Sequence, residues 1–317
     1  NVPDLVITSL TRSPANPTSI DPVTFEAVVT NTGAAVAGPF VVYFKKGGDW
    51  PPAPESQIVV DSLAAGASTT VTRESVLFSA GQGYQNGAFA DWVVNADTSN
   101  CPPLYCNDPL GAVLELNERN NASDPDIIDG VLPPEVVSTP DGPPDAGRFP
   151  GLTISPDLES VVTYRGATLT VMEVRFRTGT FDPTTSNFTL MIDADRNVNT
   201  GHPSSVASCD PSAQDYGLIG VDYLMAVDDP LGASVAVLEY TGSCNSYSAT
   251  GGYIEVTVQS DGVDLVIPNS ELPLSPSGFF NYKVTAFADH PSEPNSFTGV
   301  LDWVPDVDTV PAANFPN

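Results

Sequence analysis

Short runs of β-branched and aromatic residues, interrupted by Pro, Gly, Asn and Asp, recur along nearly the whole sequence. Branched and aromatic side chains pack well on a pleated surface, and the residues between the runs favour turns. No stretch of amphipathic helical period is long enough to predict a substantial helix. The sequence therefore predicts an all-β fold.

The runs fall into two groups. About seven strands are expected in the first group, a number and spacing that suit an immunoglobulin-like sandwich over residues 1–123. These are Leu5–Leu10, Val23–Thr30, Phe40–Phe44, Gln57–Asp61, Ser68–Thr72, Ala88–Val94 and Ala112–Leu116. About nine more predict a larger second β-sandwich over residues 152–317, jelly-roll-like or similar. These are Leu158–Tyr164, Thr168–Arg177, Asn187–Ile192, Val221–Val227, Val235–Tyr240, Tyr253–Val258, Val263–Ile267, Tyr282–Ala288 and Gly299–Val304.

Residues 124–151 differ in composition from both groups. The segment is rich in Asp and contains Pro133, Pro134, Pro140, Pro143, Pro144 and Pro150. Proline at this density removes backbone donors and stiffens the chain. We therefore expect a semi-rigid linker between the two domains.

The chain is strongly acidic. Eleven basic residues against thirty-nine acidic residues give a net charge of −28. Such a surface gains no counterion release from phosphates, so nucleic acid is not an expected partner, and cations are. No apolar run approaches the roughly 18 residues of a membrane span, so membrane insertion is not expected. The alternative is that the charge only keeps a secreted or salt-adapted protein soluble.

The cysteines also favour an extracellular location. Cys101 and Cys106 form a close pair, and Cys209 and Cys244 form a wider one. No Cys-x-x-Cys spacing occurs and His is scarce, so two disulfides are favoured over a zinc site. The sequence begins with Asn1 rather than Met, which is consistent with a removed secretion signal or with an excised segment.

Three pieces of the first domain, in order, resemble the CARDB family. They are Pro3-Asp-Leu-Val-Ile7, Val28-Val-Thr-Asn-Thr-Gly33 and Leu114-Glu-Leu-Asn-Glu-Arg-Asn-Asn121. CARDB domains are adhesion-related, immunoglobulin-like modules of bacterial and archaeal surface proteins. The resemblance covers residues 1–123 and departs from the pattern at the Cys-bounded insertion between Thr98 and Gly111. It implies adhesion or spacing between surface modules, and it implies no enzymatic activity.

The second domain resembles a β-sandwich module of secreted prokaryotic proteins in the pattern Asp-x-Asp-x-Asn-x-x-Thr-Gly followed by Gly-x-Asp-Tyr. The residues concerned are Asp193, Asp195, Asn197, Asn199 and Asp222. Alternating oxygen ligands after a strand can surround a hard cation, as in the first half of an EF-hand loop. Ser204 stands where an EF-hand would need Glu, so a true EF-hand is excluded. We expect a calcium site here, with an acidic turn held by side-chain hydrogen bonds as the alternative.

Two other acidic groups are weaker candidates for calcium at the domain junctions. One is Asp124, Asp126 and Asp129, and the other is Asp302, Asp306 and Asp308. Solvated acidic loops are the favoured explanation of both groups. His202 and His290, the two histidines, lie in turn-like contexts without a Gly-x-Ser-x-Gly elbow. No catalytic residues are predicted.

Trp50, in the loop Gly47-Gly-Asp-Trp-Pro-Pro-Ala-Pro54, is a candidate for contact with a ligand or an interface. An exposed indole can stack on a sugar, although packing over its own prolines is the alternative. The sequons at Asn121 and Asn187 permit glycosylation.

These features favour a secreted, non-enzymatic structural or adhesion protein of a prokaryotic cell surface. The expected partners are copies of the chain itself, assembled into a filament, fibre or layer and stabilised by calcium. The alternative is a carbohydrate-binding or adhesin module that recognises surface glycans.

Overall fold

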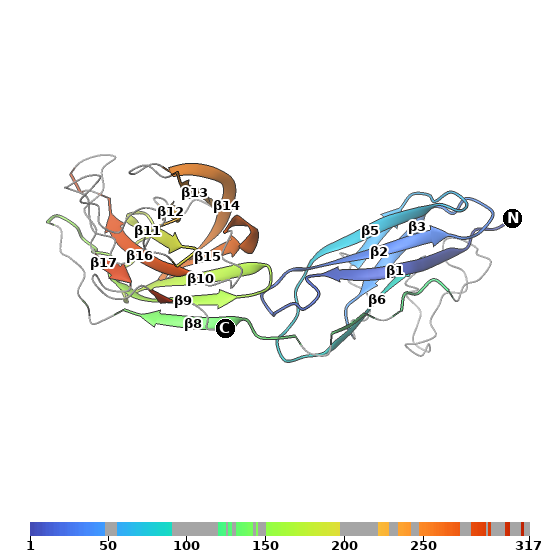
Figure 1. The fold of residues 1–317 in the computed structure, drawn as a ribbon, viewed down its shortest axis with the longest axis horizontal. Helices are drawn as coiled ribbons and strands as arrows, with labels where there is room; N and C mark the ends of the chain where they lie inside the picture. Colours follow the sequence, from blue (N-terminus) through green and yellow to red (C-terminus); the bar gives the residue numbers. More distant parts are fainter. Residues whose placement is uncertain are drawn as a thin grey trace. The chain divides into compact units, whose positions relative to one another are not determined.

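The computed structural model divides the chain into two compact units, Asn1–Pro133 and Pro134–Asn317 (Figure 1). It describes residues 1–47, 56–90, 120–124, 126–128, 131–141, 144, 150–196, 221–227, 234–241, 247–272, 280–289, 291–292, 302–304 and 312–313. Over these residues the fold is all-β apart from short 3₁₀ turns such as η3 (Asn269–Glu271), which confirms the predicted fold class. No helix in this part of the chain is long and apolar enough to span a membrane.

Over the described residues, the first unit forms two antiparallel sheets. One has the strand order β1-β2-β5 and the other the order β4-β3-β6-β7. The strands are β1 (Leu5–Ser13), β2 (Val23–Asn31), β3 (Phe40–Lys45), β4 (Gln57–Val60), β5 (Ser68–Val76), β6 (Tyr84–Ala90) and β7 (Asp126–Ile128). The first five agree closely with the predicted runs, β6 begins earlier than expected, and the predicted strand at 112–116 lies outside the described residues.

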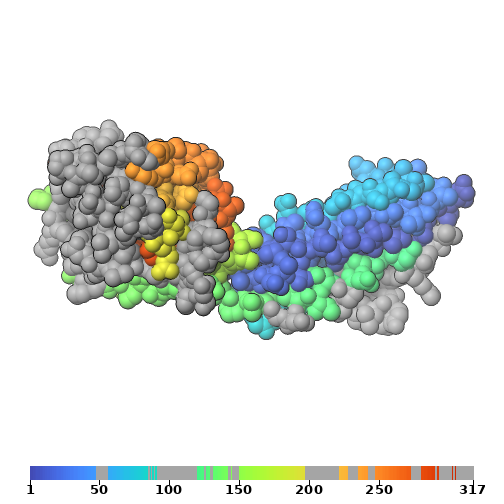
Figure 2. All heavy atoms as spheres, viewed as in Figure 1, coloured from blue at the N-terminus to red at the C-terminus, as the bar shows by residue number. Residues whose placement is uncertain are grey.

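Alternation of side chains explains how the two sheets pack. On β2, Phe25, Ala27 and Val29 are buried, and on β3, Phe40 and Val42 are buried with them in one core. Successive residues of a strand point to opposite faces, so every second residue faces the partner sheet. The opposite face of β1, β2 and β5 is polar, with exposed Thr8, Glu26 and Thr70. It forms the blue and cyan surface of Figure 2.

The family motifs meet in one polar network at an end of the first unit. The side chain of Asn31 is fully buried. Its Oδ1 accepts the backbone N–H groups of Asp4 and Gly33, both at 3.1 Å, and its Nδ2 donates to Ala35 O at 2.8 Å and Leu63 O at 2.9 Å. The carboxylate of Asp4 accepts from Thr32 Oγ1 at 2.9 Å and from Asn120 Nδ2 at 3.1 Å.

Gly33 is required at this junction for steric reasons. A Cβ on Gly33 would lie 2.5 Å from backbone atoms of Val2, Pro3 and Asp4, closer than side chains approach. The Pro-Asp and Asn-Thr-Gly motifs therefore join the first strand to the end of the second.

Over the described residues, the second unit forms one antiparallel sheet of eleven strands. Their order is β17-β16-β11-β12-β13-β14-β15-β10-β9-β8, with β18 also pairing with β16. The strands are β8 (Glu135–Pro140), β9 (Leu158–Arg165), β10 (Leu169–Phe176), β11 (Ser186–Asp193), β12 (Tyr223–Val227), β13 (Ser234–Tyr240), β14 (Tyr247–Gln259), β15 (Gly262–Pro268), β16 (Asn281–Ala288), β17 (Asp302–Val304) and β18 (Ala312–Ala313).

This sheet rolls on itself, so its two ends approach each other (Figure 1). Tyr282 of β16 donates from its hydroxyl to Thr139 Oγ1 of β8 at 2.7 Å. The carboxylate of Asp302 in β17 accepts the backbone N–H of Leu158 in β9. The second domain therefore encloses its core with one rolled sheet, where the sequence predicts two packed sheets. Phe188, Leu190 and Tyr282 are fully buried in this core.

The predicted linker contains two strands. Residues 126–128 form β7, which pairs with β6, and residues 135–140 form β8, which pairs with β9. Ile128 and Val131 are buried in the core of the first unit, and Arg12 forms an ion pair with Asp126. Proline does not prevent this arrangement, because β8 is an edge strand and Pro140 is its last residue. The proline content of the segment predicted a linker. It could not show that β6 and β9 are available as pairing partners for the residues between the prolines.

Candidate metal centres

Three carboxylates gather where β11 ends and β12 begins. Asp193 is the last residue of β11, Asp195 lies two residues later, and Asp222 directly precedes β12. Asp222 N donates to Ile192 O at 2.8 Å, and Ala194 N donates to Asp222 Oδ2 at 2.9 Å. One oxygen from each of the three carboxylates lies within 4.8 Å of the others. We call this group the β11–β12 cluster.

Burial determines the electrostatics of the β11–β12 cluster. Asp193 is fully buried, and its Oδ2 accepts a hydrogen bond from Asn281 Nδ2 at 3.3 Å. Burial raises the pKa of Asp222, and the charges of Asp195 and Glu239 raise it further, against the opposing effect of hydrogen bonds from the backbone at 194 and 195. Nearby, burial and the charges of Glu239 and Asp222 raise the pKa of Tyr223 to about 12. A bound cation would relieve this repulsion.

The structure thus brings together three of the five residues predicted to bind calcium. Asn197 and Asn199 lie outside the described residues. Sequence reasoning missed Asn281, because it belongs to β16, far along the chain, and reaches Asp193 through strand pairing. No local signal marks such a residue.

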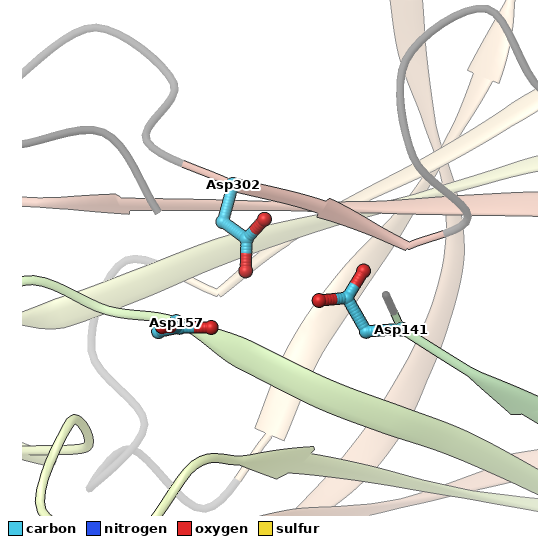
Figure 3. Close-up of side chains that lie close together, drawn as sticks. All are labelled: Asp141, Asp157 and Asp302. Atoms are coloured by element: carbon cyan, nitrogen blue, oxygen red, sulfur yellow. The ribbon is translucent and has the colours of Figure 1, made fainter. Parts of the chain in front are cut away.

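A second acidic group lies where the ends of the rolled sheet approach each other. Asp141 follows β8, Asp157 precedes β9, and Asp302 begins β17. One oxygen from each carboxylate again lies within 4.8 Å of the others, and Figure 3 shows the three side chains facing a common space. The side chain of Asp141 is fully buried, and Asp302 is 4% exposed. We call this group the seam cluster.

Arg177 partly neutralises the seam cluster. Its Nε donates to Asp157 Oδ1 at 2.8 Å, and its Nη2 lies 3.3 Å from Asp141 Oδ2. Burial disfavours the charge of Arg177, but the hydrogen bond and charge of Asp157, together with Asp141, outweigh it and raise the pKa of Arg177. The sequence grouped Asp302 with Asp306 and Asp308, which lie outside the described residues, and therefore missed this arrangement.

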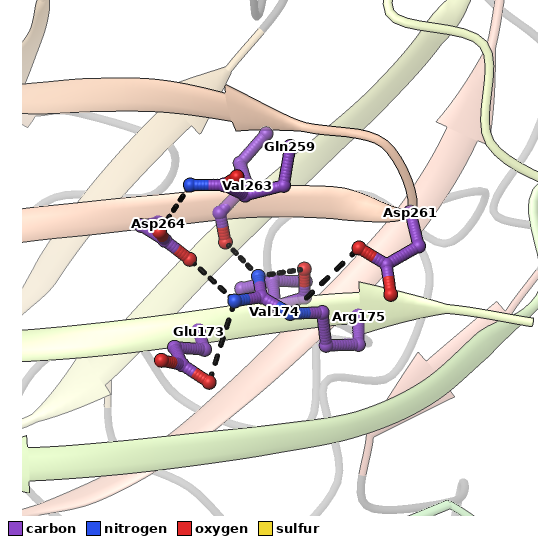
Figure 4. A network of polar contacts seen from close by, with 7 residues as sticks. All are labelled: Glu173, Val174, Arg175, Gln259, Asp261, Val263 and Asp264. Atoms are coloured by element: carbon purple, nitrogen blue, oxygen red, sulfur yellow. Dashed lines mark hydrogen bonds and ion pairs between the residues drawn. The ribbon is translucent and has the colours of Figure 1, made fainter.

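A third group of acids surrounds Arg175, which partly neutralises it (Figure 4). Its Nη2 lies 2.6 Å from Asp264 Oδ1 and 3.3 Å from Glu173 Oε2, and its Nε lies 4.0 Å from Asp261 Oδ1. Its Nη1 donates to Val263 O at 3.0 Å. Because a guanidinium occupies the position between the carboxylates, this group is an ion-pair network that links neighbouring strands rather than a cation site.

The other predicted site residues fall in three classes. Asp126 pairs with Arg12, so it is already neutralised. Asn187 is 2% exposed and donates from Nδ2 to Asp289 Oδ1 at 2.8 Å, which leaves no access for glycosylation of the folded chain. The third class contains the remaining residues. Asn121 and Asp124 lie in the described segment 120–124, and the others lie outside the described part of the chain: Trp50, Cys101, Cys106, Asp129, His202, Cys209, Cys244, His290, Asp306 and Asp308.

The chemistry of the donors limits which metal fits. Both clusters offer carboxylate oxygens, and hard cations such as Ca²⁺ and Mg²⁺ prefer oxygen ligands, whereas zinc sites use His and Cys. In the seam cluster the guanidinium of Arg177 already lies beside two of the carboxylates. In the β11–β12 cluster burial and the charge of Asp195 contribute to the raised pKa of Asp222, and a divalent cation would relieve that repulsion. The β11–β12 cluster is therefore the better candidate for a divalent cation.

Comparison with known proteins finds similarity for the first unit. The CARDB family model matches residues 2–124. Among solved structures, the chain is similar to the CARDB domain of a Pyrococcus furiosus protein in complex with di-metal ions, with 18% identity, a TM-score of 0.30, and coverage of 42% of this chain and 90% of that one. It is also similar to a domain of a candidate cell surface protein from Methanosarcina acetivorans, with 25% identity, a TM-score of 0.30, and coverage of 42% and 94%. No curated protein matches the chain.

The family match covers less than half of the chain, so it concerns the first unit alone. It agrees with the resemblance carried by the Pro-Asp, Asn-Thr-Gly and Asn-Asn motifs, whose side chains form the polar network around Asn31. Over residues 2–124 the first unit is therefore similar to CARDB domains.

Proposed function

We propose that this chain is a non-enzymatic structural and adhesion protein of the cell surface. We further propose that it assembles with copies of itself into a filament, fibre or layer, stabilised by calcium. The observation that carries the proposal is the CARDB domain at residues 2–124, because CARDB domains are adhesion-type domains associated with cell surfaces. An extracellular location follows from that role.

Open sheet edges support self-association. Among the described residues, β4 of the first unit pairs on one side only, with β3, and β8 of the second unit pairs on one side only, with β9. Val59 on β4 is 66% exposed and Val136 on β8 is 53% exposed. An edge strand with exposed apolar side chains can accept a strand from another chain. Either edge offers a place where copies could join.

The charge of the chain supports a role for cations in that assembly. Each copy carries a net charge of −28, so copies repel one another until their charge is screened or neutralised. A divalent cation bound to the β11–β12 cluster would remove part of that charge. Calcium accepts six to eight oxygen ligands in flexible geometry, which suits carboxylates on a strand end and its following turn.

The assembly is tested by electron microscopy of the purified full chain, with calcium and with a chelator. We expect ordered assemblies in calcium and their loss on chelation. Monodisperse monomers under both conditions would contradict self-association. Equal assembly under both conditions would retain self-association and overturn the role of calcium.

The calcium site is tested by thermal unfolding of Asp222→Asn with and without calcium. Calcium should raise the Tm of the wild type, because a ligand that binds only the folded state stabilises it. The variant removes one ligand charge, so the calcium-dependent rise should shrink. Asp261→Asn, at an exposed position in the Arg175 network, is the matched control and should respond as the wild type does.

The same variant has a predicted pH dependence without metal. Because the folded state raises the pKa of Asp222, the protonated group contributes stability below its unfolded pKa. That contribution is lost as the pH rises through the folded pKa. The metal-free Asp222→Asn variant should therefore have a higher Tm than the wild type at pH 7, with the difference closing in acid. A lower Tm of the variant at pH 7 would contradict this electrostatic account.

A further inference from the structure

A hollow on the second unit has no role in the function proposed above. It has a volume of about 500 Å³ and lies among the segment before β9, the loop between β10 and β11, and the residues after β16. Its walls are formed by Gly151, Leu152, Thr153, Ile154, Asp182, Thr185, Asp289 and Pro291. It therefore combines two carboxylates with apolar side chains.

Hydrogen bonds hold Asp289 at the wall of the hollow. Its Oδ1 accepts from Asn187 Nδ2 at 2.8 Å, and Asn187 is itself 2% exposed in β11. The backbone N–H of Asp289 donates to Thr185 O at 3.0 Å. Gly151, which also lines the hollow, has a φ of +94°, and a Cβ there would lie 3.2 Å from Pro291 Cγ. The wall at Gly151 is thus kept free of a side chain.

Hydrogen bonds also fix the position of Asp182, which lies on the loop between β10 and β11. Its Oδ1 accepts from Thr184 Oγ1 at 2.7 Å and from Thr184 N at 2.9 Å, and its own N–H donates to Ser186 Oγ at 3.0 Å. The two hydrogen bonds from Thr184 lower the pKa of Asp182. The group is therefore ionised at neutral pH.

Neither carboxylate has a cationic partner among the described residues. The ion pairs of Arg12, Arg175 and Arg177 involve other acids. This distinguishes the hollow from the Arg175 network and from the seam cluster, in which a guanidinium already lies beside the carboxylates. The hollow presents negative charge that the described part of the chain leaves uncompensated.

The size and lining of the hollow select the class of ligand. Ligand pockets measure about 300–1,000 Å³, whereas a water molecule takes about 30 Å³, so the hollow is too large for a lone ion. Leu152, Ile154 and Pro291 offer apolar contact, and the lining residues include no aromatic ring for stacking on a sugar. A flexible aliphatic chain that ends in a positive charge matches both kinds of wall.

We propose that this hollow binds an alkylammonium group, with the ammonium between Asp182 and Asp289 and the aliphatic stem against Leu152, Ile154 and Pro291. The group belongs either to a lysine side chain of another protein or to a free aliphatic diamine. The inference does not depend on calcium or on self-association.

The test is a titration of the full chain in about 150 mM NaCl, which screens charges beyond about 8 Å. The probes are 1,5-diaminopentane, an acetylated and amidated lysine, and the neutral 1,5-pentanediol. Backbone amide shifts followed by NMR at 151–154, 185 and 289 should saturate with an amine and not with the diol. Saturation by the diamine alone identifies a free diamine as the source, and saturation by the blocked lysine shows that a protein side chain suffices.

Variants separate this site from general attraction of cations to an acidic protein. Asp182→Asn and Asp289→Asn keep an acceptor oxygen for Thr184 and for Asn187, and each should weaken amine binding about tenfold. Glu255→Gln removes the same charge from an exposed position on β14 and should leave the affinity unchanged. Equal weakening by Glu255→Gln, equal binding of the diol, or no saturation by either amine would overturn the proposal.

Discussion

A single buried amide, that of Asn31, joins three separate segments of the first unit. Both lone-pair positions of its oxygen and both of its N–H groups are occupied by backbone partners from Asp4, Gly33, Ala35 and Leu63. A buried polar side chain stabilises the fold when all of its hydrogen bonds are made. Its removal is destabilising, because its buried partners are then left without hydrogen bonds. The residue is therefore structural, and its effect should appear in stability.

Asn31→Ala should lower the free energy of unfolding by about 2–4 kcal/mol, since it leaves buried backbone groups without partners. Urea unfolding measures the change. Thr8→Ala, at an exposed position on β1, is the control, with an expected effect within about 0.5 kcal/mol. A similar, small effect for both variants would show that the polar network contributes little.

At the scale of elements, closure of the rolled sheet depends on a few contacts between strands that are far apart in sheet order. Tyr282 of β16 contacts Thr139 of β8, and Asp302 of β17 contacts the start of β9. Burial raises the pKa of Tyr282, against the opposing effect of its hydrogen bond to Thr139. The phenol thus stays protonated beyond its ordinary range, and the stability it contributes is lost only as the pH rises through that raised pKa.

Tyr282→Phe should lower the free energy of unfolding by about 0.5–1.5 kcal/mol, because it removes one buried hydrogen bond and keeps the ring. The destabilisation should be present at neutral pH and shrink in strong alkali, where the wild type loses the bond as well. Denaturant unfolding at several pH values measures both effects. Tyr253→Phe, at a position that is 62% exposed, serves as the control. An equal loss of unfolding free energy in this control would contradict the role of the Tyr282–Thr139 contact in closing the sheet.

At the scale of the whole molecule, net charge is the dominant electrostatic feature. A charge of −28 on one chain produces self-repulsion that opposes the compact state and the approach of copies. Ion pairs with Arg12, Arg175 and Arg177 offset the charge locally, but eleven basic residues cannot balance thirty-nine acids. Ionic conditions should therefore affect both folding and assembly.

Raising NaCl from about 10 mM to about 150 mM shortens the screening length from about 30 Å to about 8 Å. The Tm of the chelator-treated chain should rise over this range because repulsion is screened. Calcium at constant ionic strength should raise it further, which separates binding from screening. A Tm that falls with NaCl would show that attractive ion pairs outweigh the repulsion.

The sequence by itself determined the all-β class, most strand positions and the CARDB motifs. Strand formation depends on local branching and alternation, and turn residues mark the breaks between strands. The carboxylates of Asp193 and Asp195 were also predictable, because they lie close together after one strand. The proximity of Asp222 to them was expected from the Gly-x-Asp-Tyr pattern that follows them in the sequence.

Only the tertiary structure decided which strands pair and which distant acids meet. Periodicity assigns a residue to a face but does not choose the neighbour of a strand. Contacts between residues far apart in sequence place β8 in the sheet of the second unit and roll that sheet on itself. They also bring Asp302 close to Asp141 and Asp157. The alkylammonium hollow has the same origin, since its walls come from three separate segments that the sheet brings together.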